Sequence, residues 1–319
     1  MSGASGLSSG GALKAYALLV GTMTCWGMNA VLGKLAVGEV SPMVLVSARW
    51  LGVILLIAVF LQKGVRRDWP KLKPHLPFLA AMGATGFTCF NALFYIAAHS
   101  TTAINIGILQ GAIPIFVMMI AFAVYRDRIT PLQLVGVLIT ATGVVVVASG
   151  GSLERLAQLA IRNGDFLMIL ACLLYASYAV GLRRRPDVPT LSLFAVMAAA
   201  AFVVSIPFTA AEAAMGWFQW PTLTGWIVIA LVTVFPSFLA QIFFIQGVDI
   251  LGPGRAGVFA NLVPVFASLF AVIVLAEDFA FFHAVALALV LTGIWMSERF
   301  KRPIAAPETT VRKTGDAKR

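Results

Sequence analysis

The chain has 319 residues, of which 60% are hydrophobic and only 11% are charged. A soluble domain carries about 25% charged residues, so this composition excludes most water-soluble folds and indicates an all-α integral membrane protein. The formal charge of +10 would suggest a nucleic-acid partner in a soluble protein. In a membrane protein such a charge reports orientation instead, and we expect no nucleic acid to bind.

The chain opens with residues 1–14, a Ser- and Gly-rich stretch that lacks the basic start of a signal peptide. We therefore predict an uncleaved, disordered lead-in. Ten apolar segments follow, each near the roughly 20 residues that a helix needs to cross a hydrocarbon core. They cover residues 15–36, 42–61, 76–98, 101–124, 131–149, 164–182, 190–211, 223–247, 253–275 and 280–298. The polar, basic tail 299–319 is predicted to be disordered.

Lysine and arginine gather in alternate loops of this ten-span topology. One side carries Lys14, the loop from Lys63 to Lys73, Arg126, Arg128, Arg183 to Arg185 and the basic tail, whereas the other side carries only Lys34, Arg155 and Arg162. Since positive loops stay in the cytoplasm, both termini are predicted to be cytoplasmic. Both termini can share one side only if the number of spans is even, so the charges favour ten spans independently of hydropathy.

From about residue 78 onward, the first half of the chain is repeated in the second at an offset of 150 residues. Phe94 aligns with Phe244, Pro114 with Pro264, and Thr142-Gly143 with Thr292-Gly293. The copies, 15–149 and 164–298, contain five predicted spans each, and an odd number makes the second copy enter the membrane from the opposite face. Such a 5+5 inverted-topology repeat is typical of carriers that work by alternating access.

Polar side chains inside the spans are candidates for a substrate site, because a polar group facing lipid costs free energy. Asn91, Tyr95 and His99 recur every four residues and share one face of the third span. The repeat partner of Asn91 is Gln241, with Ser237 one turn before it. These groups either contact one central ligand or hydrogen-bond to neighbouring helices. His99, at a span end, is either interfacial or at the outer mouth.

Further candidates are polar or aromatic residues of spans one, four and six: Trp26, Asn29, Asn105, Gln110, Tyr175 and Tyr178. Trp26 lies inside the hydrocarbon, away from the interface where Trp normally collects. It forms either an aromatic wall for a ligand or an ordinary helix contact, and both interpretations stay open.

No Asp or Glu lies in the central part of any predicted span. A proton-coupled exporter of lipophilic cations generally needs a buried carboxylate, so neither cationic drugs nor carboxylate-based proton antiport is expected. Arg49, inside the second span, either snorkels or bonds to another helix, or it contacts an anionic group of the substrate. A weakly positive cavity lined by amides and aromatics suits a zwitterion or a neutral metabolite.

Motifs for catalysis or metal binding are absent from the predicted spans. There is no HExxH and no pair of intramembrane carboxylates, and no GxSxG lies within a predicted span. Cys25, Cys89 and Cys172 lie in apolar runs without CxxC spacing. We expect no catalytic residue, metal or cofactor, and an intramembrane enzyme is disfavoured.

Several short motifs, in this order, resemble the EamA-type carriers of the drug/metabolite transporter superfamily, over about residues 15–298. They are Cys25-Trp26-Gly27-Met28-Asn29, Asn91-Ala92-Leu93-Phe94-Tyr95, Pro114-Ile115-Phe116, Gly164-Asp165 and Pro264-Val265-Phe266. The resemblance implies a ten-helix bundle with a central cavity, in the inner (plasma) membrane. Within the family the chain is most similar to aromatic amino-acid exporters.

We therefore expect an exporter of amino acids and related small metabolites, whose partners are its substrate and membrane lipid. A carrier of another neutral or anionic metabolite, such as a sugar-linked compound, is the alternative.

Overall fold

The computed structural model describes residues 9–126, 129–152, 154, 162–251 and 259–299. Over these residues every regular element is a helix, and no strand occurs. Residues 1–8 of the expected lead-in lie outside the described residues, and so does the tail after Arg299. Helix α1 begins at Ser9, inside the segment that we expected to be irregular.

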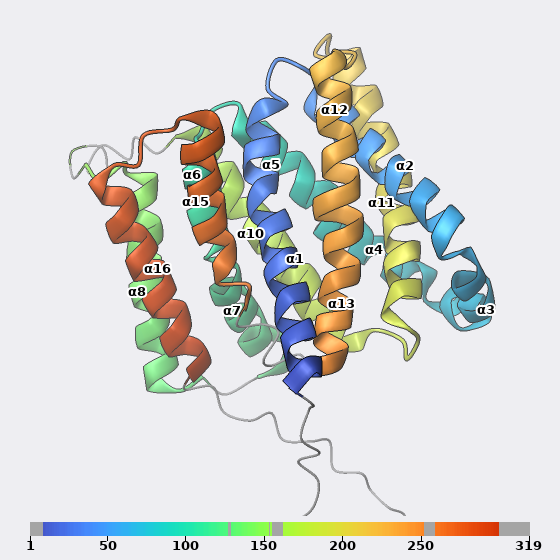
Figure 1. The fold of residues 1–319 in the computed structure, drawn as a ribbon, viewed down its shortest axis with the longest axis horizontal. Helices are drawn as coiled ribbons and strands as arrows, with labels where there is room; N and C mark the ends of the chain where they lie inside the picture. The colour runs from blue at the N-terminus through green and yellow to red at the C-terminus, as the bar shows by residue number, and fades with distance from the viewer. Residues whose placement is uncertain (1–8, 127–128, 153, 155–161, 252–258, 300–319) are drawn as a thin grey trace, which may run out of the picture.

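The helices run roughly alongside one another in a single bundle (Figure 1). In chain order they are α1 Ser9–Leu35, α2 Pro42–Phe60, α3 Gln62–Leu72, η1 Lys73–His75, α4 Leu76–Gly83, η2 Ala84–Cys89, α5 Phe90–Ala98, α6 Ala103–Gln110, α7 Ile113–Tyr125, α8 Pro131–Ala148, α10 Asn163–Gly181, η3 Leu182–Arg184, α11 Thr190–Ala214, α12 Leu223–Val232, η4 Thr233–Leu239, α13 Ala240–Leu251, α15 Leu262–Leu275 and α16 Phe281–Arg299.

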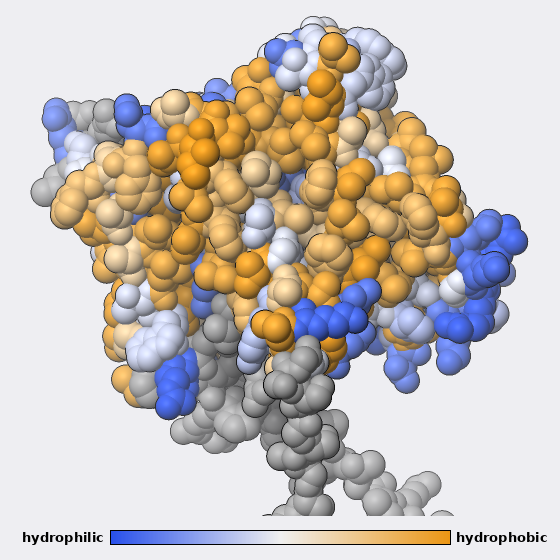
Figure 2. Space-filling model, viewed as in Figure 1, coloured by the Kyte–Doolittle hydropathy of each residue, from blue (hydrophilic) through white to orange (hydrophobic). Residues whose placement is uncertain are grey.

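Eight stretches of the described chain are long and apolar enough to cross a membrane. Two further apolar helices, Leu262–Leu275 and Phe281–Ser297, are shorter. Large apolar side chains also cover much of the surface, and Figure 2 shows them as a broad hydrophobic belt with hydrophilic residues towards its edges. A surface of this kind has lipid as its solvent, so the protein has a multi-pass membrane fold.

The basic segment after α2 forms helix α3, which the span analysis treated as a loop. Its polar residues face outward, while Asp68 and Leu72 are buried. The Asp68 carboxylate accepts a hydrogen bond of 2.6 Å from the Ser192 hydroxyl at the start of α11. Helix α3 is too polar to be predicted as a span from hydropathy, although the spacing of its buried residues is helical.

Irregular backbone recurs at the 150-residue offset. The π-helical segments η2, Ala84–Cys89, and η4, Thr233–Leu239, interrupt the third and eighth predicted spans at matching positions. Arg126 and Ala276, which end α7 and α15, adopt left-handed backbone with φ of 56° and 51°. Because π-helical turns and left-handed non-glycine residues are both uncommon, their recurrence supports the internal repeat found in the sequence.

Helix contacts follow the same pairing. Helix α1 packs against α13 and α15, α10 packs against α5 and α7, α2 packs against α11, and α8 packs against α16. The α8–α16 pair is close because Gly293 faces Gly136, and a Cβ atom on Gly293 would lie 2.4 Å from the Gly136 carbonyl oxygen. Small residues at such contacts let helices approach within the membrane.

The bundle has two distinguishable ends. The terminus end is where α1 begins at Ser9 and α16 ends at Arg299, and the far end is where α1 ends at Leu35 and α6 begins at Ala103 (Figure 1).

Candidate functional site

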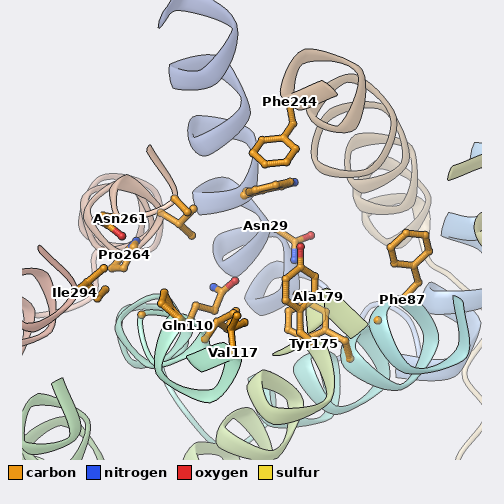
Figure 3. A pocket seen from close by; sticks show the side chains of 18 of the residues that line it. Asn29, Phe87, Gln110, Val117, Tyr175, Ala179, Phe244, Asn261, Pro264 and Ile294 are labelled. Atoms are coloured by element: carbon orange, nitrogen blue, oxygen red, sulfur yellow. The ribbon is translucent and has the colours of Figure 1, made fainter. Parts of the chain in front are cut away.

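A cavity of about 770 Å³ lies in the middle of the bundle. Its lining comes from both halves of the chain and reaches the terminus end at Arg126, Gln133, Arg183 and Ser297. In Figure 3, Asn29, Gln110 and Tyr175 point into this space from three different helices. The cavity therefore connects the centre of the bundle with its terminus end.

Eight of the twelve residues that the sequence suggested for a substrate site line the cavity: Trp26, Asn29, Arg49, Asn91, Gln110, Tyr175, Ser237 and Gln241. The other four lie outside its lining. Tyr95 is buried directly behind it, Tyr178 packs against Phe87 with ring centroids 5.4 Å apart, and Asn105 bonds to a carboxylate at the far end. His99 is exposed at the end of α5.

Arg49 joins the polar residues of four spans. It lies on α2 about midway along the helix, and its side chain is only 5% exposed. Its Nη1 donates to Asn29 Oδ1 at 3.2 Å, to Asn91 Oδ1 at 3.1 Å and to the Tyr95 hydroxyl at 2.5 Å, and its Nε donates to Ser237 Oγ at 2.6 Å. The sequence flagged these five residues separately, but no spacing along the chain shows that they meet.

The Ser237 hydroxyl is positioned by the proline before it. Pro236 has no N–H, so it cannot make the α-helical hydrogen bond to the Val232 carbonyl, one turn earlier. The Ser237 hydroxyl donates to that carbonyl at 2.5 Å, which leaves its lone pairs free to accept from Arg49. The Pro236 carbonyl in turn accepts from Trp26 Nε1 at 3.1 Å. Segment η4 thus provides the polar contacts of one wall.

Aromatic rings make up much of the remaining wall. Trp50 stacks on Phe87 with centroids 4.7 Å apart and planes 10° apart, and Phe90 lies 5.1 Å from Tyr175. Trp26 lies 5.3 Å from Phe244. Rings of this kind bury apolar or aromatic parts of a ligand and favour offset or edge contacts.

A model of the EamA-like transporter family matches the chain twice, over residues 13–149 and 162–298. The chain belongs to the EamA-like transporter family. It is 26% identical to the uncharacterized transporter YyaM of Bacillus subtilis over 290 residues, which is 88% of this chain and 92% of that protein. It is also 26% identical to the uncharacterized transporter YetK of Bacillus subtilis over 298 residues, or 92% of this chain and 89% of that one.

A solved crystal structure of another protein shares the fold of this EamA-like protein. It superposes with a TM-score of 0.60 over 92% of this chain and 98% of its own, at 18% sequence identity. At that identity the likeness concerns the fold alone. These relatives place the protein among multi-pass membrane transporters, and their names state no substrate.

At the far end, this EamA-like transporter is closed by polar contacts between spans. The buried Asp165 carboxylate, at the start of α10, accepts from the Thr101 hydroxyl and from Asn105 Nδ2. Glu277 accepts from the backbone N–H groups of Ala103 and Ile104 at 2.8 and 3.0 Å. Both carboxylates therefore hold the first turn of α6, where unpaired N–H groups and the helix dipole favour an anion.

Lys34 completes this closure from α1. Its Nζ donates to the carbonyls of Ala98 and Thr101 at 2.8 and 2.9 Å. Sequence reasoning placed Asp165 and Glu277 at span ends and gave them no role. The Gly164-Asp165 motif was the available signal for the first, but the residues that it contacts are about 60 positions away.

The part of the chain that the structure describes has no group of three or more His, Cys, Asp or Glu that could hold a metal ion. Of the cysteines, Cys172 is buried and the other two are half-buried, and all three are free.

Proposed function

We propose that this protein is an alternating-access exporter of amino acids, aromatic ones included, and of related small metabolites. The observation that carries the proposal is the cavity itself, which reaches mid-bundle from one end and is closed at the other. A volume of about 770 Å³ is within the range of roughly 300–1,000 Å³ that suits small-molecule ligands.

The mechanism rests on ten spans arranged as a 5+5 inverted repeat, from 15–149 and 164–298. Matching π-helical segments and left-handed helix ends at the 150-residue offset support this arrangement. So does the pairing of helices, since α1 contacts α13 and α15 in the way that α10 contacts α5 and α7. Two equivalent halves can exchange conformations and open a central site to each side in turn.

The terminus end is assigned to the cytoplasm, in the inner (plasma) membrane. Supporting this assignment, Arg126, Arg183 and the basic helix α3 lie at that end, and positive loops stay cytoplasmic. With this orientation the structure represents an inward-open state, ready to load substrate from the cell interior.

The composition of the cavity favours amino acids. Aromatic rings suit an apolar side chain, while Gln241, Tyr175 and Arg49 offer polar atoms. The side chains of Gln241 and Tyr175 line the cavity without a protein hydrogen-bond partner in the described structure. We expect such groups to bind the substrate, because a polar group in an apolar wall otherwise stays unpaired.

Efflux from proteoliposomes tests the proposal. Vesicles loaded with radiolabelled phenylalanine, tyrosine, tryptophan or leucine are expected to lose label faster than protein-free vesicles. Gln241→Ala is expected to slow aromatic efflux several-fold without loss of folded protein, because Gln241 makes no structural hydrogen bond. Gln62→Ala, an exposed amide on α3, is the matched control. Absence of flux for every amino acid would refute the proposal.

A second candidate is a carrier of another small anionic metabolite, and Arg49 is the observation that favours it. In the same assay, flux of an organic acid without flux of any amino acid would select it.

A further inference from the structure

Arg49 is a buried cation without a counter-charge in the described structure. Its four hydrogen-bond partners, Asn29, Asn91, Tyr95 and Ser237, are neutral. The Trp50 ring, whose centroid lies 5.5 Å from the Arg49 Cζ atom, is neutral too, and the ion pair of the described chain, Arg67–Asp68, lies elsewhere. Arginine is always protonated in proteins. An uncompensated charge inside a membrane protein is costly, so its retention at mid-depth requires a reason beyond helix packing.

One edge of the Arg49 guanidinium remains available. Nε and Nη1 make all of its hydrogen bonds, and none reaches Nη2 from the described residues. Arg49 lines the cavity, and Nη2 is not among the described polar atoms that are both fully buried and unpaired. The neutral partners therefore fix the plane of the guanidinium while leaving two N–H donors for a ligand.

Among the described residues, the charged side chains that line the cavity are all basic. Its charged lining residues are Arg49, Arg126 and Arg183, and no Asp or Glu is among the described residues that line it. The buried Asp165 is occupied by Thr101 and Asn105 at the far end. A basic lining of this kind favours anions over cations.

We propose that the Nη2 edge of Arg49 binds the carboxylate of the substrate, and that the substrate class is a small organic acid with an apolar or aromatic body. This inference rests on the proposed transport function and sharpens it. The carboxylate is the group that the site requires, and the α-ammonium of an amino acid is dispensable.

The geometry explains why the cavity is expected to bind the carboxylate of an amino acid more strongly than its ammonium group. A carboxylate at Arg49 forms charge-assisted hydrogen bonds to a guanidinium that is already oriented, so little entropy is lost on binding. An ammonium group finds only amide oxygens, the Tyr175 hydroxyl and ring faces, which hold cations weakly at partly solvated sites. We therefore expect the affinity of a ligand to depend on its carboxylate and not on its amine.

A panel of four ligands on the unmodified protein tests the inference. The ligands are phenylalanine, 3-phenylpropanoate, phenethylamine and phenylalaninamide, and their affinities are measured by calorimetry on protein in lipid nanodiscs. The affinities of phenylalanine and 3-phenylpropanoate, which carry a carboxylate, are expected to lie within about tenfold of each other. Phenethylamine and phenylalaninamide, which carry none, are expected to bind about 30-fold more weakly or not at all. Equal or tighter binding of phenethylamine would overturn the inference.

Arg49 variants connect the selectivity to this residue. Arg49→Gln is expected to weaken binding of 3-phenylpropanoate by about 30-fold or more, because the carboxylate loses its charged partner. Arg49→Lys keeps the charge and recovers part of the affinity. Arg66→Gln removes an exposed positive charge from α3, outside the cavity, and leaves the affinity unchanged. Should Arg49→Gln fail to fold, as judged by size-exclusion chromatography, the ligand panel on the unmodified protein still decides.

The outcomes separate the two proposals. If phenylalanine and 3-phenylpropanoate bind but no amino acid leaves loaded vesicles, the substrate class stands and amino-acid export fails. If amino acids are exported and phenethylamine competes as well as 3-phenylpropanoate does, export stands and the role of Arg49 fails.

Discussion

The two ends of the bundle differ in how the spans are held together. At the far end, side chains from different parts of the chain converge on the break between α5 and α6: Lys34 on its carbonyls, and Asp165 and Glu277 on the first turn of α6. At the terminus end the cavity separates the helices, and Arg126 and Arg183 line its mouth. The far end is thus closed by charged side chains that bond to the ends of helices.

The repeat makes this comparison more exact. Each half places bases at the end of its first span, Lys34 in the first half and Arg183 and Arg184 in the second. Lys34 holds the carbonyls at the end of α5, whereas the Arg184 guanidinium lies over the Tyr125 ring, 5.5 Å from its centroid. The base at the end of the first span thus bonds to carbonyls at the closed end, whereas its counterpart in the second half lies over a ring at the open end.

The largest expected effect comes from forcing apart two helices that pack towards the closed end. A Cβ atom on Gly107 of α6 would lie 2.3 Å from the Ala267 Cβ atom of α15. Gly107→Leu is therefore expected to destabilise the protein by about 3 kcal/mol, the upper range for overpacking. Thermal unfolding in detergent measures this effect. Gly64→Leu on α3, where no atom lies within 4 Å of the new Cβ, serves as the control. Equal unfolding temperatures would contradict the closeness of α6 and α15.

Substitution of Asp165 is expected to have a smaller effect on stability and a specific effect on how often the far end opens. Asp165→Ala leaves the Thr101 hydroxyl and the Asn105 amide without their acceptor, at a cost of about 1–3 kcal/mol. The reporter is Asn29→Cys in a variant without native cysteines, labelled by an impermeant maleimide applied from the far side. Labelling is expected to rise about tenfold in Asp165→Ala, because the closed end opens more often.

Two controls accompany this measurement. Asp165→Asn keeps one acceptor oxygen and is expected to label at an intermediate rate, and Asp187→Ala, an exposed acid, leaves labelling unchanged. Labelling from the far side that is already rapid with Asp165 intact would show that the far end is not closed.

Much of the fold could be predicted from the sequence, because lipid imposes a length and a polarity on each span. Helix α3 and the start of α1 at Ser9 were not predicted, because hydropathy does not identify polar helices. The site was predicted less well. Individual polar residues such as Asn91 and Ser237 stand out against an apolar background, but their convergence on Arg49 joins α1, α2, α5 and η4. Such contacts depend on packing between distant segments, which local patterns do not encode.

The smallest effect on access is expected at the open end, where helix α8 begins with a capping box. The Thr130 side chain accepts from the Gln133 N–H at 3.2 Å, and the Gln133 side chain accepts from the Thr130 N–H at 2.9 Å. Thr130→Ala removes one half of this reciprocal pair and is expected to cost about 1 kcal/mol of stability. Labelling of the Asn29→Cys reporter from the far side is expected to stay at its basal level, because Thr130 lies at the opposite end of the bundle from the contacts of Lys34, Asp165 and Glu277. A rise in labelling comparable to that of Asp165→Ala would mean that general instability, and not the loss of specific contacts, opens the far end.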